Sequence, residues 1–90
     1  MRKFKVTLDK NKQSEDIVFD AQEKQFMIIS NEAILALSFV FRDDLVKGGT
    51  YQENFNKSKE NIPRKIKHQY LKITRQDPNA TLSFKVVLLP

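Results

Sequence analysis

Apolar and polar residues alternate at both ends of the chain, and this feature constrains the fold more than any other. Over residues 3–8, three apolar residues alternate with two lysines and a threonine. Residues 81–89 alternate in the same way. Because successive side chains of a β-strand point to opposite faces, a period of two is typical of a strand with one face on a core. The sequence therefore predicts a strand at each end.

The rest of the first thirty residues also favours strands. The short apolar run 17–19 follows a polar stretch, and we expect it to form a hairpin with the first strand, placing Lys3 and Lys5 on the solvent face. The pattern of residues 20–30 fits either a helix or a strand. Their start resembles a helix N-terminus, with an acidic residue at the third helical position, whereas 26–29 is a continuous apolar run rich in strand formers. We favour a third strand there.

Residues 32–47 have the spacing of an amphipathic helix. Ser30 or Asn31 suits its N-cap, and the adjacent glycines 48–49 suit its end, because glycine adopts the left-handed cap conformation easily. Apolar residues form two stripes on opposite sides of this helix: Ile34, Leu37, Phe41 and Leu45 on one, and Leu35, Phe39 and Val46 on the other. Such a helix is buried between two layers, or has one side free for a partner.

Residues 63–76 predict a second helix. Pro63 suits its first turn. Ile66, Tyr70 and Ile73 then follow at intervals of four and three residues, which places them on one helical face. A strong turn signal at 76–79 ends the segment.

These elements predict one small α+β domain spanning residues 1–90. An antiparallel sheet, made of the N-terminal hairpin and the C-terminal strand, would pack on the two helices. The same order also fits a winged helix-turn-helix, with 63–76 as the recognition helix and 81–89 as the wing. The connection between the helices is longer than the turn of a plain helix-turn-helix, which weakens this second interpretation.

Composition excludes several classes of function. The chain has no cysteine, which excludes disulfides, thiolate zinc sites and a cysteine nucleophile. Its only two glycines are adjacent, so the sequence contains no glycine-rich phosphate-binding loop. The neighbouring carboxylates Asp43 and Asp44 diverge on a helix. We therefore expect no catalytic residue, no metal and no cofactor. Residues 1–8 do not resemble a signal peptide and the apolar stretch 26–41 is too short and polar for a membrane span, so we expect a cytoplasmic protein.

Charge is unevenly distributed along this basic chain, whose formal net charge is +5. Residues 1–12 carry five basic and one acidic side chain, residues 13–56 carry three and eight, and residues 57–90 carry eight and two. On the predicted helix 63–76 the basic side chains gather opposite the apolar stripe, with no acidic residue among them. An unrelieved positive face favours an anionic partner, and phosphate backbones are the commonest.

We therefore expect a non-enzymatic protein that binds nucleic acid, duplex DNA in particular, through helix 63–76. The candidate contacts are its basic residues and those just before it: Lys57, Lys59, Arg64, Lys65, Lys67, His68, Lys72 and Arg75. A secondary basic patch at the N-terminus consists of Arg2, Lys3 and Lys5. Tyr51 and Phe55 are candidates for base stacking.

Three alternatives stay open. The basic face can simply be solvated, or can dock on the acidic segment 13–56 of its own fold. The chain can be a protein-interaction module, an inhibitor or assembly factor that uses helix 32–47 to bind a second copy or an acidic partner; its interface candidates are Leu35, Phe39 and Val46. Finally, the chain can be a basic ribonuclease-type toxin, with the phosphate site formed by Tyr51, Tyr70, His68 and Arg75.

Overall fold

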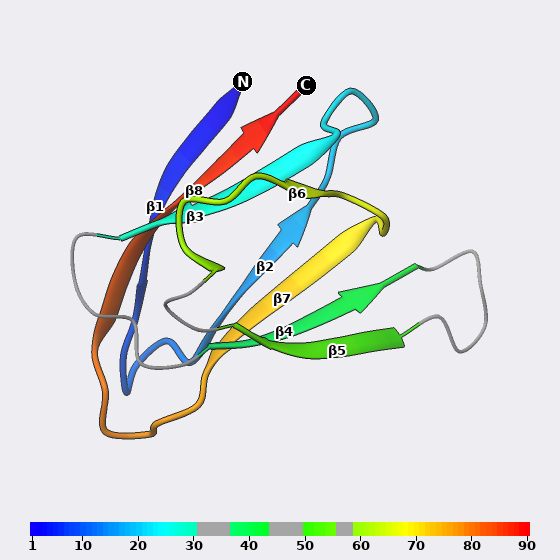
Figure 1. The fold of residues 1–90 in the computed structure, drawn as a ribbon. Helices are drawn as coiled ribbons and strands as arrows, with labels where there is room; N and C mark the ends of the chain where they lie inside the picture. Colours follow the sequence, from blue (N-terminus) through cyan, green and yellow to red (C-terminus); the bar gives the residue numbers. More distant parts are fainter. Residues whose placement is uncertain (31–36, 44–49, 56–58) are drawn as a thin grey trace.

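The structure, a computed structural model, describes residues 1–30, 37–43, 50–55 and 59–90. These residues form β-strands and no α-helix (Figure 1). In chain order the strands are β1 (Arg2–Leu8), β2 (Ser14–Val18), β3 (Gln25–Ile29), β4 (Leu37–Arg42), β5 (Thr50–Phe55), β6 (Arg64–Lys65), β7 (Tyr70–Arg75) and β8 (Leu82–Leu89). Within the described residues, no helix is long and apolar enough to cross a membrane.

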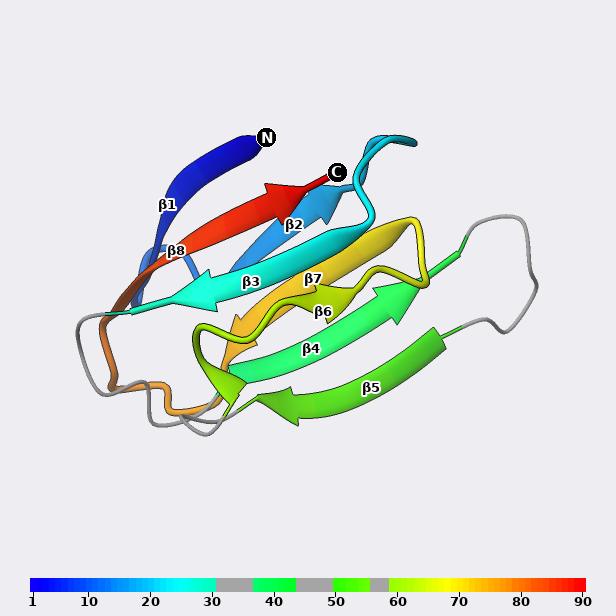
Figure 2. The same cartoon turned by 45° about the horizontal axis from the view of Figure 1, so that its top comes forward.

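The strands pair into two four-stranded antiparallel sheets that face each other (Figure 2). Sheet A has the order β1-β8-β3-β6, and sheet B has the order β2-β7-β4-β5. The two terminal strands are neighbours in sheet A, where residues 2–8 of β1 pair with residues 82–88 of β8. The two ends of the chain therefore lie side by side in one sheet.

The core lies between the sheets and consists of the inward-facing residues of every long strand. Phe26 of sheet A and three phenylalanines of sheet B form its aromatic centre: Phe39, Phe41 and Phe55. The rings of Phe39 and Phe55 are stacked with centroids 5.0 Å apart, and Phe26 lies 5.9 Å from Phe41. Each fully buried side chain of this size stabilises the fold by about 1.5–3 kcal/mol.

The predicted helix 32–47 is wrong over its described part, because residues 37–42 form strand β4. Leu37, Phe39 and Phe41 alternate with Ser38 and Val40, and all three face the core. On a helical wheel Phe39 falls opposite the other two, but on a strand all three lie on one face. Residues 31–36 and 44–49 lie outside the described part of the chain, and so does the predicted stop at the two glycines.

The predicted helix 63–76 is also wrong, since this segment contains β6 and β7 joined by residues 66–69. Leu71, Ile73 and Arg75 alternate inward along β7. Their period of two, combined with burial between two sheets, outweighs the helical spacing that runs through Ile66 and Tyr70. The α+β class and the winged helix-turn-helix both required this helix, so both are overturned by the all-strand fold.

The strands predicted at both ends and at residues 26–29 are confirmed as β1, β8 and β3. The hairpin predicted between the first two strands is wrong. Strand β1 pairs with β8 in sheet A, whereas β2 pairs with β7 in sheet B. The connection 9–13 therefore passes from one sheet to the other (Figure 1). Adjacency in the sequence favoured the hairpin, but the longer alternating strand β8 offers β1 a complete register.

Candidate functional site

The predicted contact residues do not share one face, because alternation along the strands sends them in different directions. Lys72 points to the outer face of sheet B, in register with Asp16 and Val40. Arg75 is buried at the end of β7. Lys59 is half-buried and its ammonium donates to the carbonyl of Asn54. Lys57 lies outside the described residues.

Four of the predicted residues do come together, at the side of the sandwich where the edge strands β5 and β6 face each other. Here a cleft of about 530 Å³ opens between the sheets, and we call it the β5–β6 cleft. Its lining consists of Phe26, Phe41, Tyr51, Glu53, Arg64, Lys65, Lys67 and His68. The cleft forms because β6 is only two residues long and covers little of the edge of sheet B.

Three rings cluster along one wall of the cleft. The rings of Tyr51 and His68 are stacked, with centroids 6.2 Å apart and an interplanar angle of 9°. Phe41 lies behind them, 5.4 Å from His68 and 6.1 Å from Tyr51. Phe41 is buried, whereas Tyr51 is 52% exposed. The wall therefore begins in the core and ends in an aromatic surface that faces solvent.

A carboxylate fixes the orientation of the His68 ring. The Nδ1 atom of His68 lies 3.0 Å from Oδ2 of Asp43, whose other oxygen accepts the backbone amide of Gln69 at 2.8 Å. These two hydrogen bonds lower the pKa of Asp43 below its ordinary value. Since an ionised carboxylate only accepts, Nδ1 donates to it, and Nε2 points away from Asp43 and accepts only in the neutral ring.

The cleft also holds an ion pair between Arg64 of β6 and Glu53 of β5. The guanidinium also lies over the Phe26 ring, 5.3 Å from its centroid. Burial raises the pKa of Glu53, but the hydrogen bond and charge of Arg64, with smaller effects of Lys59 and Tyr51, outweigh burial and lower it. The charge of Arg64 is therefore already matched inside the fold.

Lys65 and Lys67 are the two cations of the cleft that stay exposed. Among the described residues, no carboxylate lies within ion-pair distance of either ammonium. Arg64 and His68 hold the structure of the cleft through Glu53 and Asp43, whereas these two lysines offer their charge outward. All four are predicted contact residues, but the sequence pattern does not show which of them meet a carboxylate.

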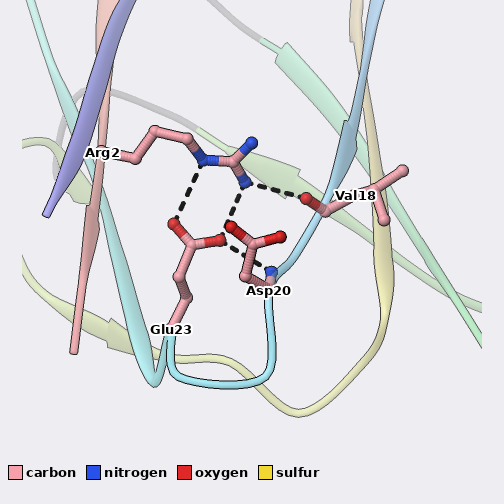
Figure 3. Close-up of polar contacts among 4 residues, drawn as sticks. All are labelled: Arg2, Val18, Asp20 and Glu23. Atoms are coloured by element: carbon pink, nitrogen blue, oxygen red, sulfur yellow. Dashed lines mark hydrogen bonds and ion pairs between the residues drawn. The ribbon is translucent and has the colours of Figure 1, made fainter.

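The predicted N-terminal patch also contains one basic residue that pairs with a carboxylate and two lysines that stay exposed. Arg2 donates from Nε and Nη2 to both oxygens of Glu23, at 3.2 and 2.8 Å, and from Nη2 to the carbonyl of Val18 at 2.8 Å (Figure 3). Glu23 also accepts the amide of Asp20 at 2.8 Å (Figure 3). Arg2 therefore ties β1 to the end of β2 and the turn that follows it.

Lys3 and Lys5 point to the outer face of sheet A, where the pairing of β1 with β8 adds a third lysine. Lys85 lies directly opposite Lys5 in the register. We call these three residues the lysine face. The four described strands of sheet A carry six basic residues and no acidic one: Arg2, Lys3, Lys5, Arg64, Lys65 and Lys85.

Sequence reasoning missed Asp43, Glu53 and Lys85 as members of these surfaces. The alternation over 81–89 places Lys85 opposite the core residues of its strand, which was the available signal. Nothing in the sequence indicated that β8 neighbours β1. The two carboxylates gave no signal of their own, because Asp43 reaches His68 through the pairing of β4 with β7, and Glu53 reaches Arg64 only where the edges of the two sheets face each other.

The other predicted sites have these positions. Phe39, a candidate for a partner interface, is 0% exposed and packs in the core. Leu35 and Val46 lie outside the described residues. Tyr51 and His68 of the ribonuclease interpretation meet in the cleft, whereas Tyr70 and Arg75 do not line it. In the described part of the chain, no group of three or more His, Cys, Asp or Glu residues is arranged to hold a metal ion.

Comparison with protein-family models, with curated proteins and with solved structures finds no match for this chain.

Proposed function

We propose that the protein binds single-stranded nucleic acid, without chemical conversion, in the β5–β6 cleft. The observation that carries this proposal is the stacked, solvent-facing pair of Tyr51 and His68 beside Lys65 and Lys67. An aromatic surface stacks an unpaired base, and neighbouring cations hold the phosphates on either side of it. This is the combination by which proteins bind single strands of varied sequence.

A single strand suits this site better than a duplex. The expectation of duplex DNA depended on a recognition helix, and that helix is absent from the described chain. The cleft is recessed between two sheet edges, and its volume of about 530 Å³ is typical of pockets that enclose a small molecule or a single base. In a duplex the faces of the bases are already stacked on each other and do not reach such a recess.

The lysine face supplies a second stretch of positive charge on the same sheet. Lys65 lies on β6, the edge strand of sheet A, while Lys3, Lys5 and Lys85 lie on the strands at the other side of it. A strand that enters the cleft and continues over sheet A meets no acidic residue of that sheet. The cytoplasmic setting expected from the sequence is part of this proposal.

Binding of a fluorescently labelled single strand, followed by anisotropy over a series of salt concentrations, tests the proposal. Each phosphate contact contributes about 0.7 to the slope of log affinity against log salt. The double variant K65Q/K67Q should therefore lower the slope by about 1.4. Tyr51→Ala should weaken binding at every salt concentration, by about fivefold or more for one stacked base.

Lys72→Gln is the control on the outer face of sheet B, where it removes one positive charge against the two removed by K65Q/K67Q. It should leave the slope close to that of the wild type. Equal losses per removed charge in Lys72→Gln and in K65Q/K67Q would show that binding follows net charge and not the cleft. Tighter binding of a duplex of the same sequence, or no binding at low salt, would also exclude the proposal.

One observation favours a second function, the cleavage of RNA. His68 is oriented by Asp43 and stacked on Tyr51, and in its neutral form its Nε2 can accept a proton, as a general base does. Incubation with labelled RNA and DNA single strands separates the two functions. RNA that shortens with the wild type and stays intact with His68→Gln would favour cleavage, whereas intact RNA supports binding alone.

A further inference from the structure

Arg75 is a buried cation with one buried N–H donor that has no partner. It is the last residue of β7 and is 7% exposed, on the same inward face as Leu71 and Ile73. Its Nη1 donates to the carbonyl of Ala80 at 2.8 Å. Its Nε is buried and has no hydrogen-bond partner.

The charge of Arg75 lacks a partner of opposite sign. Buried charges in proteins are usually paired with an opposite charge as well as hydrogen-bonded, and the carbonyl of Ala80 supplies a hydrogen bond only. In the described part of the chain, no carboxylate lies within ion-pair distance of Arg75. The arrangement therefore leaves a place for a negative group.

A cavity of about 330 Å³ adjoins this side chain. It lies between the β1–β2 turn and the β7–β8 turn, which meet at the same end of the sandwich (Figure 1). Lys10, Asn11, Asn79 and Thr81 line it together with Arg75. These residues supply one further positive charge, two amides and a hydroxyl, all of which bind oxygen atoms.

The acidic side chains of the two turns are occupied by their own loops. Asp9 lines the cavity, but its Oδ1 accepts the backbone amides of Asn11 and Lys12, at 2.8 and 3.0 Å. Asp77 likewise accepts the amide of Asn79 at 2.9 Å. Both carboxylates therefore stabilise the turns that shape the cavity, and neither pairs with Arg75.

We propose that this cavity is a binding site for a small oxyanion, a phosphate or carboxylate group held by Arg75 and Lys10. A guanidinium presents parallel N–H donors that match two oxygens of such a group. The site is separate from the β5–β6 cleft. Arg75 lies seven positions after His68 in mostly extended chain, which corresponds to a distance on the order of 20 Å. The inference therefore does not depend on the proposed function.

The test is an NMR titration of the isotopically labelled protein with inorganic phosphate, at constant ionic strength maintained with chloride. The Nε–H resonance of Arg75 is assigned by through-bond correlation from its own backbone, so no variant is needed to identify it. It should shift and saturate as the phosphate is added. A parallel titration with acetate distinguishes a phosphate site from a carboxylate site, according to which anion saturates the shift at the lower concentration.

Lys10→Gln changes an exposed turn residue and leaves the core intact. It should weaken anion binding by about two- to fivefold, as expected for one partly screened charge. Lys72→Gln, which is remote from the cavity, should leave it unchanged. An Arg75 Nε–H resonance that does not move with either anion, or that moves equally with chloride, would overturn the proposal. So would equal weakening by the two lysine variants.

Discussion

Three of the basic residues that sequence analysis assigned to an anionic partner have a carboxylate partner in the fold. Arg2 pairs with Glu23, Arg64 with Glu53 and His68 with Asp43. Exposed ion pairs contribute only about 0–1 kcal/mol. The Arg64–Glu53 pair is shielded, with side chains 26% and 12% exposed. Its loss therefore leaves a charge that water solvates poorly.

Glu53→Gln should destabilise the fold by about 1–3 kcal/mol, because Arg64 keeps its charge beside Phe26 without its partner. The midpoint of urea unfolding measures this change. Glu15→Gln is the control, because its partner Lys12 is 52% exposed and water solvates that charge when the pair is lost, so the loss is at most about 1 kcal/mol. Equal midpoints for the two variants would contradict the structural importance assigned to the Arg64–Glu53 pair.

Acid should weaken the fold through three carboxyl groups whose pKa values are lowered in the folded state: Glu23, Asp43 and Glu53. Burial raises the pKa of Glu23, but the amide of Asp20 and the Arg2 guanidinium outweigh it. A group with a lowered pKa binds protons more readily when unfolded, so its stabilisation is complete above its unfolded pKa. Those ordinary values are 4.5 for glutamate and 3.8 for aspartate.

Thermal unfolding followed from neutral pH downward should therefore show a constant midpoint until about pH 5, and then a fall. Glu23→Gln should lower the midpoint at neutral pH and reduce the fall on acidification, because one of the three groups no longer titrates. A fall of unchanged size in this variant would exclude Glu23 as a contributor.

At the scale of elements, strands β1 and β8 could be predicted, whereas the spacing in β4 and β7 predicts helices. Spacings of four residues fit both structures, because four is close to one helical turn and is also an even number. Leu37 and Phe41 therefore fit a helix as well as a strand. The intervening Phe39 decides between them, since it shares their face only in a strand. Long alternation at the two ends left no such ambiguity.

Phe39→Ala tests the strand directly. In the structure Phe39 is completely buried and stacked on Phe55, so the substitution should destabilise the fold by about 3–5 kcal/mol. On the helix first expected, Phe39 would lie on a side available to a partner, and its loss would alter stability little. Val40→Thr, on the opposite face of the same strand, should change the free energy of unfolding by no more than about 1 kcal/mol.

At the scale of the whole molecule, charge is divided between the sheets. The described strands of sheet B carry three basic and three acidic residues: Arg42, Lys72 and Arg75, and Glu15, Asp16 and Glu53. The charged residues on the described strands of sheet A are all basic. The sequence showed that positive charge gathers at both ends of the chain. Which strands bring those ends together depends on long-range pairing, which local patterns do not encode.

This division implies that the lysine face opposes folding while it favours an anionic partner. Lys5 and Lys85 are directly opposite each other, and like charges in that position destabilise a sheet. Lys85→Gln should therefore stabilise the fold by about 0.2–1 kcal/mol at low salt. The gain should vanish at high salt, where the repulsion is screened.

The same variant should bind single-stranded nucleic acid less tightly, with a salt slope reduced by about 0.7. Urea unfolding at two salt concentrations and the anisotropy assay give both quantities for one protein. If Lys85 does not contact the nucleic acid, its substitution would change the stability of the fold without changing the slope of log affinity against log salt. A stabilised fold combined with a weaker, less salt-dependent complex would identify Lys85 as a contact kept at the expense of stability. If Lys85→Gln instead destabilises the fold at low salt, the repulsion inferred across β1 and β8 is absent.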